Sequence, residues 1–238
     1  MFFSVKKQTL IYGFLVLLGI TALVLCGAVK EAKEDISPAV QTASCGAAGK
    51  TILIDPGHGG EDPGATANGI SEKDINLSVA HKLKKCIEDN GGTAVMTREE
   101  DRSTGGDGKF SKSEDLKKRR NMSKECGADI FVSIHMNKFT QEKYKGAQVF
   151  YSASNEESRI LGEAIQKALP EILNDGNTRV AKKSDGNIFI LNNVSVPSVI
   201  VECGFLSNSE EAEKLKNEEY QDKMAQAIYA GIENYFNK

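Results

Sequence analysis

Hydrophobic positions along the chain alternate between short β-favouring runs and longer stretches with helical spacing. The β-favouring runs lie at residues 52–54, 93–97, 129–137, 147–151, 187–191 and 198–203. Helical spacing appears at residues 71–87, 116–126, 156–169 and 220–235, and Pro170 is expected to end the third helix. Strands that alternate with helices predict an α/β fold, a three-layer sandwich around a mostly parallel, mixed sheet of about six strands.

A long apolar run precedes this predicted domain. Residues 10–29 are almost wholly apolar and follow Lys6 and Lys7. About 20 apolar residues can cross a bilayer as a helix, and the preceding lysines favour a cytoplasmic N-terminus. We expect residues 1–29 to be an uncleaved membrane anchor, residues 30–49 a linker, and residues 50–238 one extracytoplasmic domain. A cleaved signal peptide, which would give a secreted protein, is the alternative.

Charge and cysteine content narrow the range of partners. The formal net charge is −3. The chain therefore lacks the basic excess that would indicate nucleic acid as a partner. The five cysteines are dispersed and lack CxxC spacing, which does not fit a zinc ribbon or a dense disulfide framework. Neither GxGxxG nor GxxxxGK[ST] occurs, so the glycines do not predict a phosphate site.

Two predicted strands end in a histidine. His58 follows the first strand inside a glycine turn, and His135 lies near the end of the third. Parallel neighbouring strands bring such ends to one edge of the sheet, and Glu72 lies one loop away. Taken alone, each of these residues could have a purely structural role. Together, two imidazoles and a carboxylate form the ligand set of a catalytic zinc. His81 lies on the opposite face of its helix and is expected to be a surface histidine.

The last predicted strand brings a second carboxylate, Glu202, to an edge of the sheet. Successive residues of a strand point to opposite faces. If Glu202 points into the site, Cys203 points away from it. The pattern therefore argues against a Cys–His nucleophile that uses Cys203.

Ordered motifs in the predicted domain carry a family resemblance. They are IDPGHGG at 54–60, SEKD at 71–74, TR at 97–98, Leu116 with Arg119, ADIFVSIHMN at 128–137 and VECGFLSN at 201–208. With these motifs, the chain from residue 50 to 236 resembles the zinc-dependent N-acetylmuramoyl-L-alanine amidases of the amidase-3 group. The resemblance implies that residues 50–238 are a catalytic domain.

The resemblance also implies roles for individual residues. It implies that one Zn²⁺ per chain is bound by His58, Glu72 and His135, and that Glu202 is the catalytic acid/base. It further implies supporting or substrate-binding positions at Arg98, Arg119 and Asn137.

Within that group, the chain is most similar to the short, germination-specific amidases of spore-forming bacteria. The shared features are the apolar N-terminal segment, the lack of a wall-binding repeat domain, and the segments 178–191 and 220–236. Those enzymes remove the peptide from muramic acid in the spore cortex during sporulation, a step towards the muramic-δ-lactam needed for germination. The similarity implies peptidoglycan as substrate, a location facing the wall or cortex, and an accessory protein for localisation or activation. Cys203 and Met136 depart mildly from the family pattern.

The implied zinc ligands and acid/base are suited to the hydrolysis of an amide bond. Zinc lowers the pKa of bound water to about 7, and Glu202 would pass the water's proton to the departing amine of L-alanine. Three alternatives stay open at this point. They are a zinc peptidase that acts within wall peptides, a non-catalytic wall-binding module, and a structural zinc site closed by four protein ligands.

Overall fold

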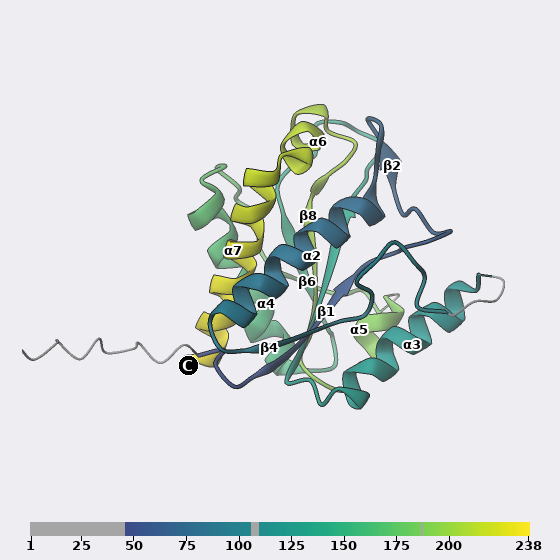
Figure 1. Ribbon diagram of the computed structural model, residues 1–238. Helices are drawn as coiled ribbons and strands as arrows, with labels where there is room; N and C mark the ends of the chain where they lie inside the picture. The colour runs from purple at the N-terminus through teal and green to yellow at the C-terminus, as the bar shows by residue number, and fades with distance from the viewer. Residues whose placement is uncertain (1–45, 106–109, 187) are drawn as a thin grey trace, which may run out of the picture. The chain divides into compact units, whose positions relative to one another are not determined.

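A mixed six-stranded sheet organises the computed structural model, which describes residues 46–105, 110–186 and 188–238 (Figure 1). Across the sheet the strand order is β4-β1-β5-β8-β6-β7. Neighbouring strands are parallel except for the antiparallel pair of β6 and β8. The strands are β1 (Thr51–Pro56), β4 (Thr93–Met96), β5 (Ile130–Asn137), β6 (Gln148–Tyr151), β7 (Lys182–Lys183) and β8 (Ser198–Phe205).

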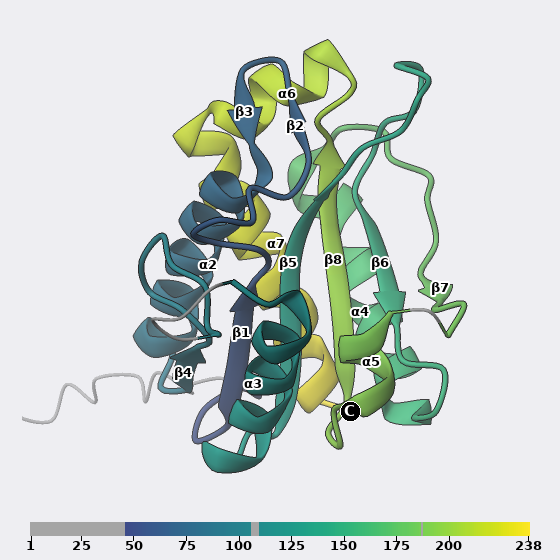
Figure 2. The same ribbon diagram turned by 90° about the vertical axis from the view of Figure 1, so that its right-hand side faces the viewer.

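Helices cover both faces of this sheet, which confirms the predicted three-layer α/β fold. One face carries α2 (Glu72–Asp89), α4 (Glu156–Leu173) and α7 (Glu218–Phe236). In front of the other face in Figure 2 lie α3 (Lys112–Glu125) and α5 (Phe189–Asn193). The remaining elements are α6 (Ser209–Lys216) and a small hairpin of β2 (Thr66–Ala67) and β3 (Ile70–Ser71).

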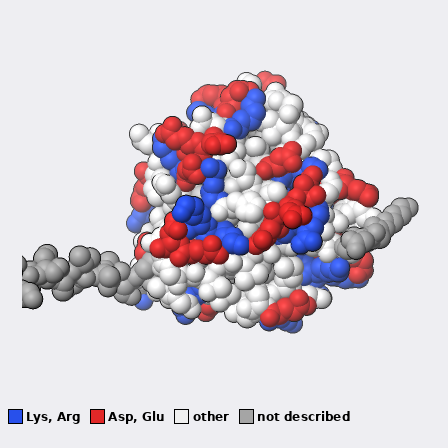
Figure 3. Space-filling view, viewed as in Figure 1, with Lys and Arg blue, Asp and Glu red and all other residues white. Residues whose placement is uncertain are grey.

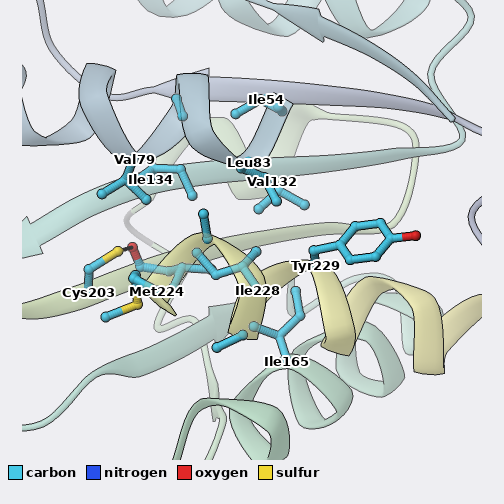
Figure 4. Packing of buried hydrophobic residues seen from close by; sticks show 14 of the residues in the cluster. Ile54, Val79, Leu83, Val132, Ile134, Ile165, Cys203, Met224, Ile228 and Tyr229 are labelled. Atoms are coloured by element: carbon cyan, nitrogen blue, oxygen red, sulfur yellow. Dashed lines mark hydrogen bonds between the residues drawn. The ribbon is translucent and has the colours of Figure 1, made fainter. Parts of the chain in front are cut away.

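Strand alternation divides the apolar side chains between the two faces. Val132 and Ile134 of β5 enter the core under α2, α4 and α7 (Figure 4). Phe131 instead packs in the smaller core with α5. Cys203 lies fully buried in the larger core, as the alternation predicts. Helices α4 and α7 approach closely at Gly231, where a Cβ would lie 2.3 Å from the Cα of Ile165.

The fifth predicted strand differs from expectation. The strand predicted at residues 187–191 is wrong, because residues 189–193 form the short helix α5. A short apolar run does not distinguish a buried helix from a strand, and the adjacent Ile190 and Leu191 are both buried here. The remaining strand of the six-stranded sheet is instead β7, which was not predicted. Its two exposed lysines lie in a polar stretch without apolar alternation.

Helix α4 also runs further than predicted. Pro170 lies inside it rather than after it, and the helix ends at Asn174 in the left-handed conformation (φ 48°). Proline lacks an N–H donor, but the carbonyl of Pro170 still accepts the N–H of Asn174. Ile172 and Leu173 pack against the core, so the last turn gains burial that favours it over termination.

Acidic and basic side chains are interspersed on the face shown in Figure 3. Many form ion pairs along or between helices, such as Lys85 with Asp89 and Lys82 with Asp222. Such exposed pairs typically contribute only about 0–1 kcal/mol each.

The N-terminal boundary of the domain is partly visible. The predicted anchor and most of the predicted linker lie outside the described residues, and no helix within the described ranges is long and apolar enough to cross a membrane. Ala47, inside the predicted linker, is fully buried in the larger core. Gly49 donates its N–H to the carbonyl of Gly91 at 2.9 Å. Any shortened chain should therefore retain residues 46–49.

Candidate metal centre and active site

The structure brings together the three residues predicted as metal ligands. His58 follows β1, His135 lies in the adjacent parallel strand β5, and Glu72 opens α2. One donor atom from each residue lies within 4.8 Å of the others. Glu72 is 3.3 Å from His58 Nε2 through Oε2 and 2.8 Å from His135 Nδ1 through Oε1. The arrangement is a possible metal site.

Glu72 is held in place from several sides. Its Oε2 accepts the N–H of Ala65 at 2.7 Å, and its Oε1 accepts the N–H of Met136 at 3.0 Å. Burial alone would raise its pKa, but hydrogen bonds and charge from His135 and His58 outweigh it and hold the pKa well below its usual range. The carboxylate is therefore ionised at neutral pH, as a metal ligand must be.

Asp62 orients the first histidine and was not predicted from the sequence. Its Oδ2 lies 2.8 Å from His58 Nδ1, while its Oδ1 accepts the N–H of Gly64 at 3.1 Å. Metal-binding histidines commonly make such a hydrogen bond from the ring nitrogen that does not face the metal. The available signal was a carboxylate four residues after a histidine within a glycine-rich loop.

Two glycines make room for the converging side chains. A Cβ on Gly57 would lie 2.2 Å from His135 Cε1. A Cβ on Gly64 would lie 2.5 Å from Glu72 Oε2, and its φ of +66° also disfavours a side chain. The glycine turn thus allows the second imidazole to approach the backbone that carries the first.

Arg119 and Arg98 both donate hydrogen bonds to the backbone of the glycine turn that carries His58. Arg119 donates to the carbonyls of Pro56 and His58, at 2.8 and 2.6 Å. Arg98 donates to the carbonyls of Pro56 and Gly57, at 3.0 and 3.1 Å. Both guanidinium groups belong to buried residues. Their contacts support the turn, and Arg119 also lines the pocket beside the histidines.

Asp55 connects Arg119 to the sheet, a role that the sequence did not reveal. Its carboxylate accepts hydrogen bonds from Arg119, Thr97 and Ser133, at 2.6, 2.7 and 2.7 Å. Burial would raise its pKa, but the charge of Arg119 and these hydrogen bonds lower it. Asp115 accepts a further hydrogen bond from Arg119 at 2.7 Å, which completes a buried Asp55–Arg119–Asp115 network.

Glu202 stands beside the histidines on the neighbouring strand. It is in register with His135 of β5 on one side and with Gln148 of β6 on the other. Its Oε2 is buried and has no hydrogen-bond partner among the described residues. Burial raises its pKa to about 7, with the imidazoles lowering it and Glu72 raising it. A carboxyl group of this kind is suited to exchange protons near neutral pH.

The remaining predicted positions are more peripheral. Asn137 lies at the end of β5, where its carbonyl accepts the N–H of Leu206 at 2.8 Å. His81 is exposed and contacts the carbonyl of Glu99 through Nε2 at 3.0 Å, as expected for a surface histidine. Cys203 points into the core, and burial raises its pKa well above the usual thiol range, so it does not serve as a nucleophile.

A pocket of about 290 Å³ opens beside the histidines, between α3 and α5. Both His58 and His135 line it, together with apolar side chains from the two helices. A second cavity, of about 320 Å³, is lined by Lys145, Glu211 and Tyr220 and contains none of the predicted site residues. The first pocket therefore adjoins the candidate metal site.

Comparison with known sequences agrees with this geometry. The profile of the N-acetylmuramoyl-L-alanine amidase family amidase-3 matches residues 52–234. The germination-specific N-acetylmuramoyl-L-alanine amidase of Bacillus subtilis (strain 168) is 39% identical over 194 residues, which is 80% of this chain and 81% of that protein. The amidase LytC of the same organism is 34% identical over 190 residues, 79% of this chain but 36% of LytC.

Solved structures show the same fold. The CwlD amidase from Clostridioides difficile, determined in complex with the GerS lipoprotein, is 43% identical with a TM-score of 0.75. That comparison covers 79% of this chain and 98% of CwlD. The catalytic domain of CwlV from Bacillus (Paenibacillus) polymyxa var. colistinus is 29% identical with a TM-score of 0.69, over 79% of this chain and 98% of that domain. The chain belongs to the amidase-3 family of N-acetylmuramoyl-L-alanine amidases.

Proposed function

We propose that this peptidoglycan amidase binds one zinc ion through His58, Glu72 and His135 and uses Glu202 as its acid/base. The bond cleaved joins the lactyl group of N-acetylmuramic acid to the L-alanine of the stem peptide. One observation carries the proposal: three metal-binding donors converge within 4.8 Å, and a carboxyl group with an unpartnered buried oxygen stands on the next strand.

The donor set fits zinc. Two imidazoles and a carboxylate are a common ligand set of catalytic zinc sites, which leave a fourth position open. A structural zinc site would need four protein ligands, and the described ranges supply three at this cluster. Asp62 supplies the supporting hydrogen bond that zinc-binding histidines usually make.

The two glutamates have different chemical capacities. When bound, zinc would polarise the carbonyl and lower the pKa of water. The oxygens of Glu72 already accept backbone N–H groups and face both imidazoles, so Glu72 is a poor proton shuttle. Glu202 has an oxygen free of such bonds, so it would accept a proton from the attacking water and donate it to the departing amine nitrogen. A non-catalytic binding module would have no use for such a group.

We further propose that the amide is cleaved in the spore cortex during sporulation, as a step towards muramic-δ-lactam. The germination-specific relative and the CwlD structure support this role. The CwlD complex also supports an accessory protein, a lipoprotein in that case, as a partner here. If the role is correct, spores that lack this protein should contain cortex without muramic-δ-lactam when their muropeptides are separated by chromatography. Normal lactam content would contradict it.

The metal assignment predicts a selective loss of zinc. His135→Ala should lose most bound zinc and retain the fold, because the imidazole lies near a strand end beside a pocket rather than in the core. The measurement is zinc content per chain together with circular dichroism. His81→Ala is the control, and it should keep zinc and activity. An equal loss of zinc from His81→Ala would show that the ligand set is wrong.

The acid/base assignment predicts a separation of binding from catalysis. Glu202→Gln retains the size of the side chain but removes the base, so zinc content should stay near the wild-type level. Hydrolysis should fall by roughly 10²–10⁴-fold, the usual contribution of a positioned acid/base. Glu72→Gln, the matched control, should lose zinc and activity together. Near-normal peptide release by Glu202→Gln at normal zinc content would exclude the mechanism.

We also propose that residues 1–29 anchor the enzyme on the outer side of the cytoplasmic membrane, since residues 10–29 are almost wholly apolar. Full-length protein should sediment with membranes and be released by detergent but not by high salt. A chain that begins at Gly46 should be soluble, because residues 46–49 are retained with the core. Recovery of full-length protein only in the soluble cytosolic fraction would contradict the anchor.

A further inference from the structure

We infer that the pocket between α3 and α5 binds the sugar ring of the muramic acid, with Phe189 as its aromatic contact surface. The glycan half of the substrate then lies in the pocket beside the histidines, and its stem peptide leaves past Glu202. This inference rests on the proposed function and adds to it the direction of the substrate and a subsite for the sugar.

The direction of the substrate follows from the position of Glu202, the proposed acid/base. Across the sheet the site residues come in the order His58, His135 and Glu202, on or beside β1, β5 and β8. The departing amine must receive its proton from Glu202, so the peptide half of the substrate lies on that side. Both histidines line the pocket, whereas Glu202 does not. The pocket also reaches Ile200, two residues before Glu202 on β8, so it extends from the histidines towards the starts of the strands. A ligand in it adjoins the proposed metal donors without reaching Glu202, which places there the acyl half and the sugar that it carries.

The charges around the pocket favour a neutral ligand. Asp55 and Asp115 are already paired with Arg119, while Asp62 faces the pocket and contacts His58. Lys112 also lines the pocket and offsets the charge of Asp62, so the lining has no unpaired positive excess that would select the carboxylates of a stem peptide. The sugar ring and its N-acetyl group have no charge, and their hydroxyl and amide groups can form hydrogen bonds with Asp62 and the exposed Lys112.

The size and walls of the pocket fit a ring rather than the lactyl group alone. One water molecule takes up about 30 Å³ in the liquid, so the pocket has room for a ligand much larger than the few heavy atoms of a lactyl group. The pocket holds about 290 Å³, with apolar walls from Leu116, Ile188 and Ile200. Phe189 lies at its edge and is 36% exposed, although phenylalanine side chains are usually buried. An exposed aromatic ring beside these apolar walls offers a large rigid contact surface for the C–H face of a sugar.

Phe139 provides a matched control for this aromatic contact. It is also an exposed phenylalanine, at 49%, but it packs edge-to-face on Tyr144 at a ring distance of 4.6 Å. It does not line the pocket. Truncating Phe139 therefore removes a similar exposed ring without changing the proposed subsite.

The test compares two soluble substrates with the zinc-loaded, full-length enzyme. One is an N-acetylmuramoyl tripeptide, and the other is a D-lactoyl tripeptide of the same sequence without the sugar. Phe189→Ala should lower kcat/KM for the muramoyl substrate by roughly 10-fold or more and change it for the lactoyl substrate by less than about twofold. Phe139→Ala should change neither by more than about twofold. Failure of the wild-type enzyme to cleave the muramoyl substrate would count against the proposed function itself.

Equal losses on both substrates, or no loss on the muramoyl substrate, would overturn the subsite. Ligand-observed NMR gives a second readout that does not depend on turnover. With the full-length Glu202→Gln protein and the muramoyl tripeptide, saturation transfer should reach the ring and N-acetyl protons. Adding Phe189→Ala should remove that transfer and keep transfer to the peptide methyl protons. Transfer to the sugar that is unchanged by Phe189→Ala would contradict the inference, even if the lactoyl substrate is not cleaved.

Discussion

The buried ion pair between Asp55 and Arg119 fixes the turn on which the site depends. Arg119 holds Asp55 on one side and donates to the carbonyls of Pro56 and His58 on the other. The pair thus ties the end of β1 to helix α3 and sets the direction in which His58 leaves the strand. Removing one partner of a buried pair typically costs about 3–5 kcal/mol, since the other charge is left uncompensated. Here such a loss would also release the turn that presents the first imidazole.

The sheet supplies the rest of the geometry. Parallel strands β1, β5 and β8 end at one edge, and strand alternation directs His135 and Glu202 to one face while Ile134, Val201 and Cys203 enter the core on the other. The first turn of α2 then brings Glu72 against both imidazoles. The close approach is possible because Gly57 leaves space for the His135 ring. Glu202 on β8 and the three converging donors His58, Glu72 and His135 thus come from different elements of the fold.

Much of this arrangement could be predicted from the sequence. Apolar strands that end in His58 and His135, and a strand that carries Glu202, were sufficient to place these side chains at one edge of a parallel sheet. The contacts of Asp62 and Asp55 could not be predicted, because they depend on loop conformation and on pairing with residues distant in sequence. Helix α5 was predicted as a strand, since a short apolar run has no decisive period. That error concealed the position of Phe189 and therefore the wall of the pocket.

The central claim is that zinc-dependent cleavage occurs between the muramic lactyl group and L-alanine. Mass spectrometry of purified peptidoglycan tests it most directly, after incubation with the full-length enzyme loaded with zinc and with enzyme stripped by a chelator. The account predicts intact stem peptides with a free L-alanine amine, glycan strands with free lactyl carboxyl groups, and no release without zinc. Release of single amino acids or shortened peptides, or equal release by the stripped enzyme, would contradict it.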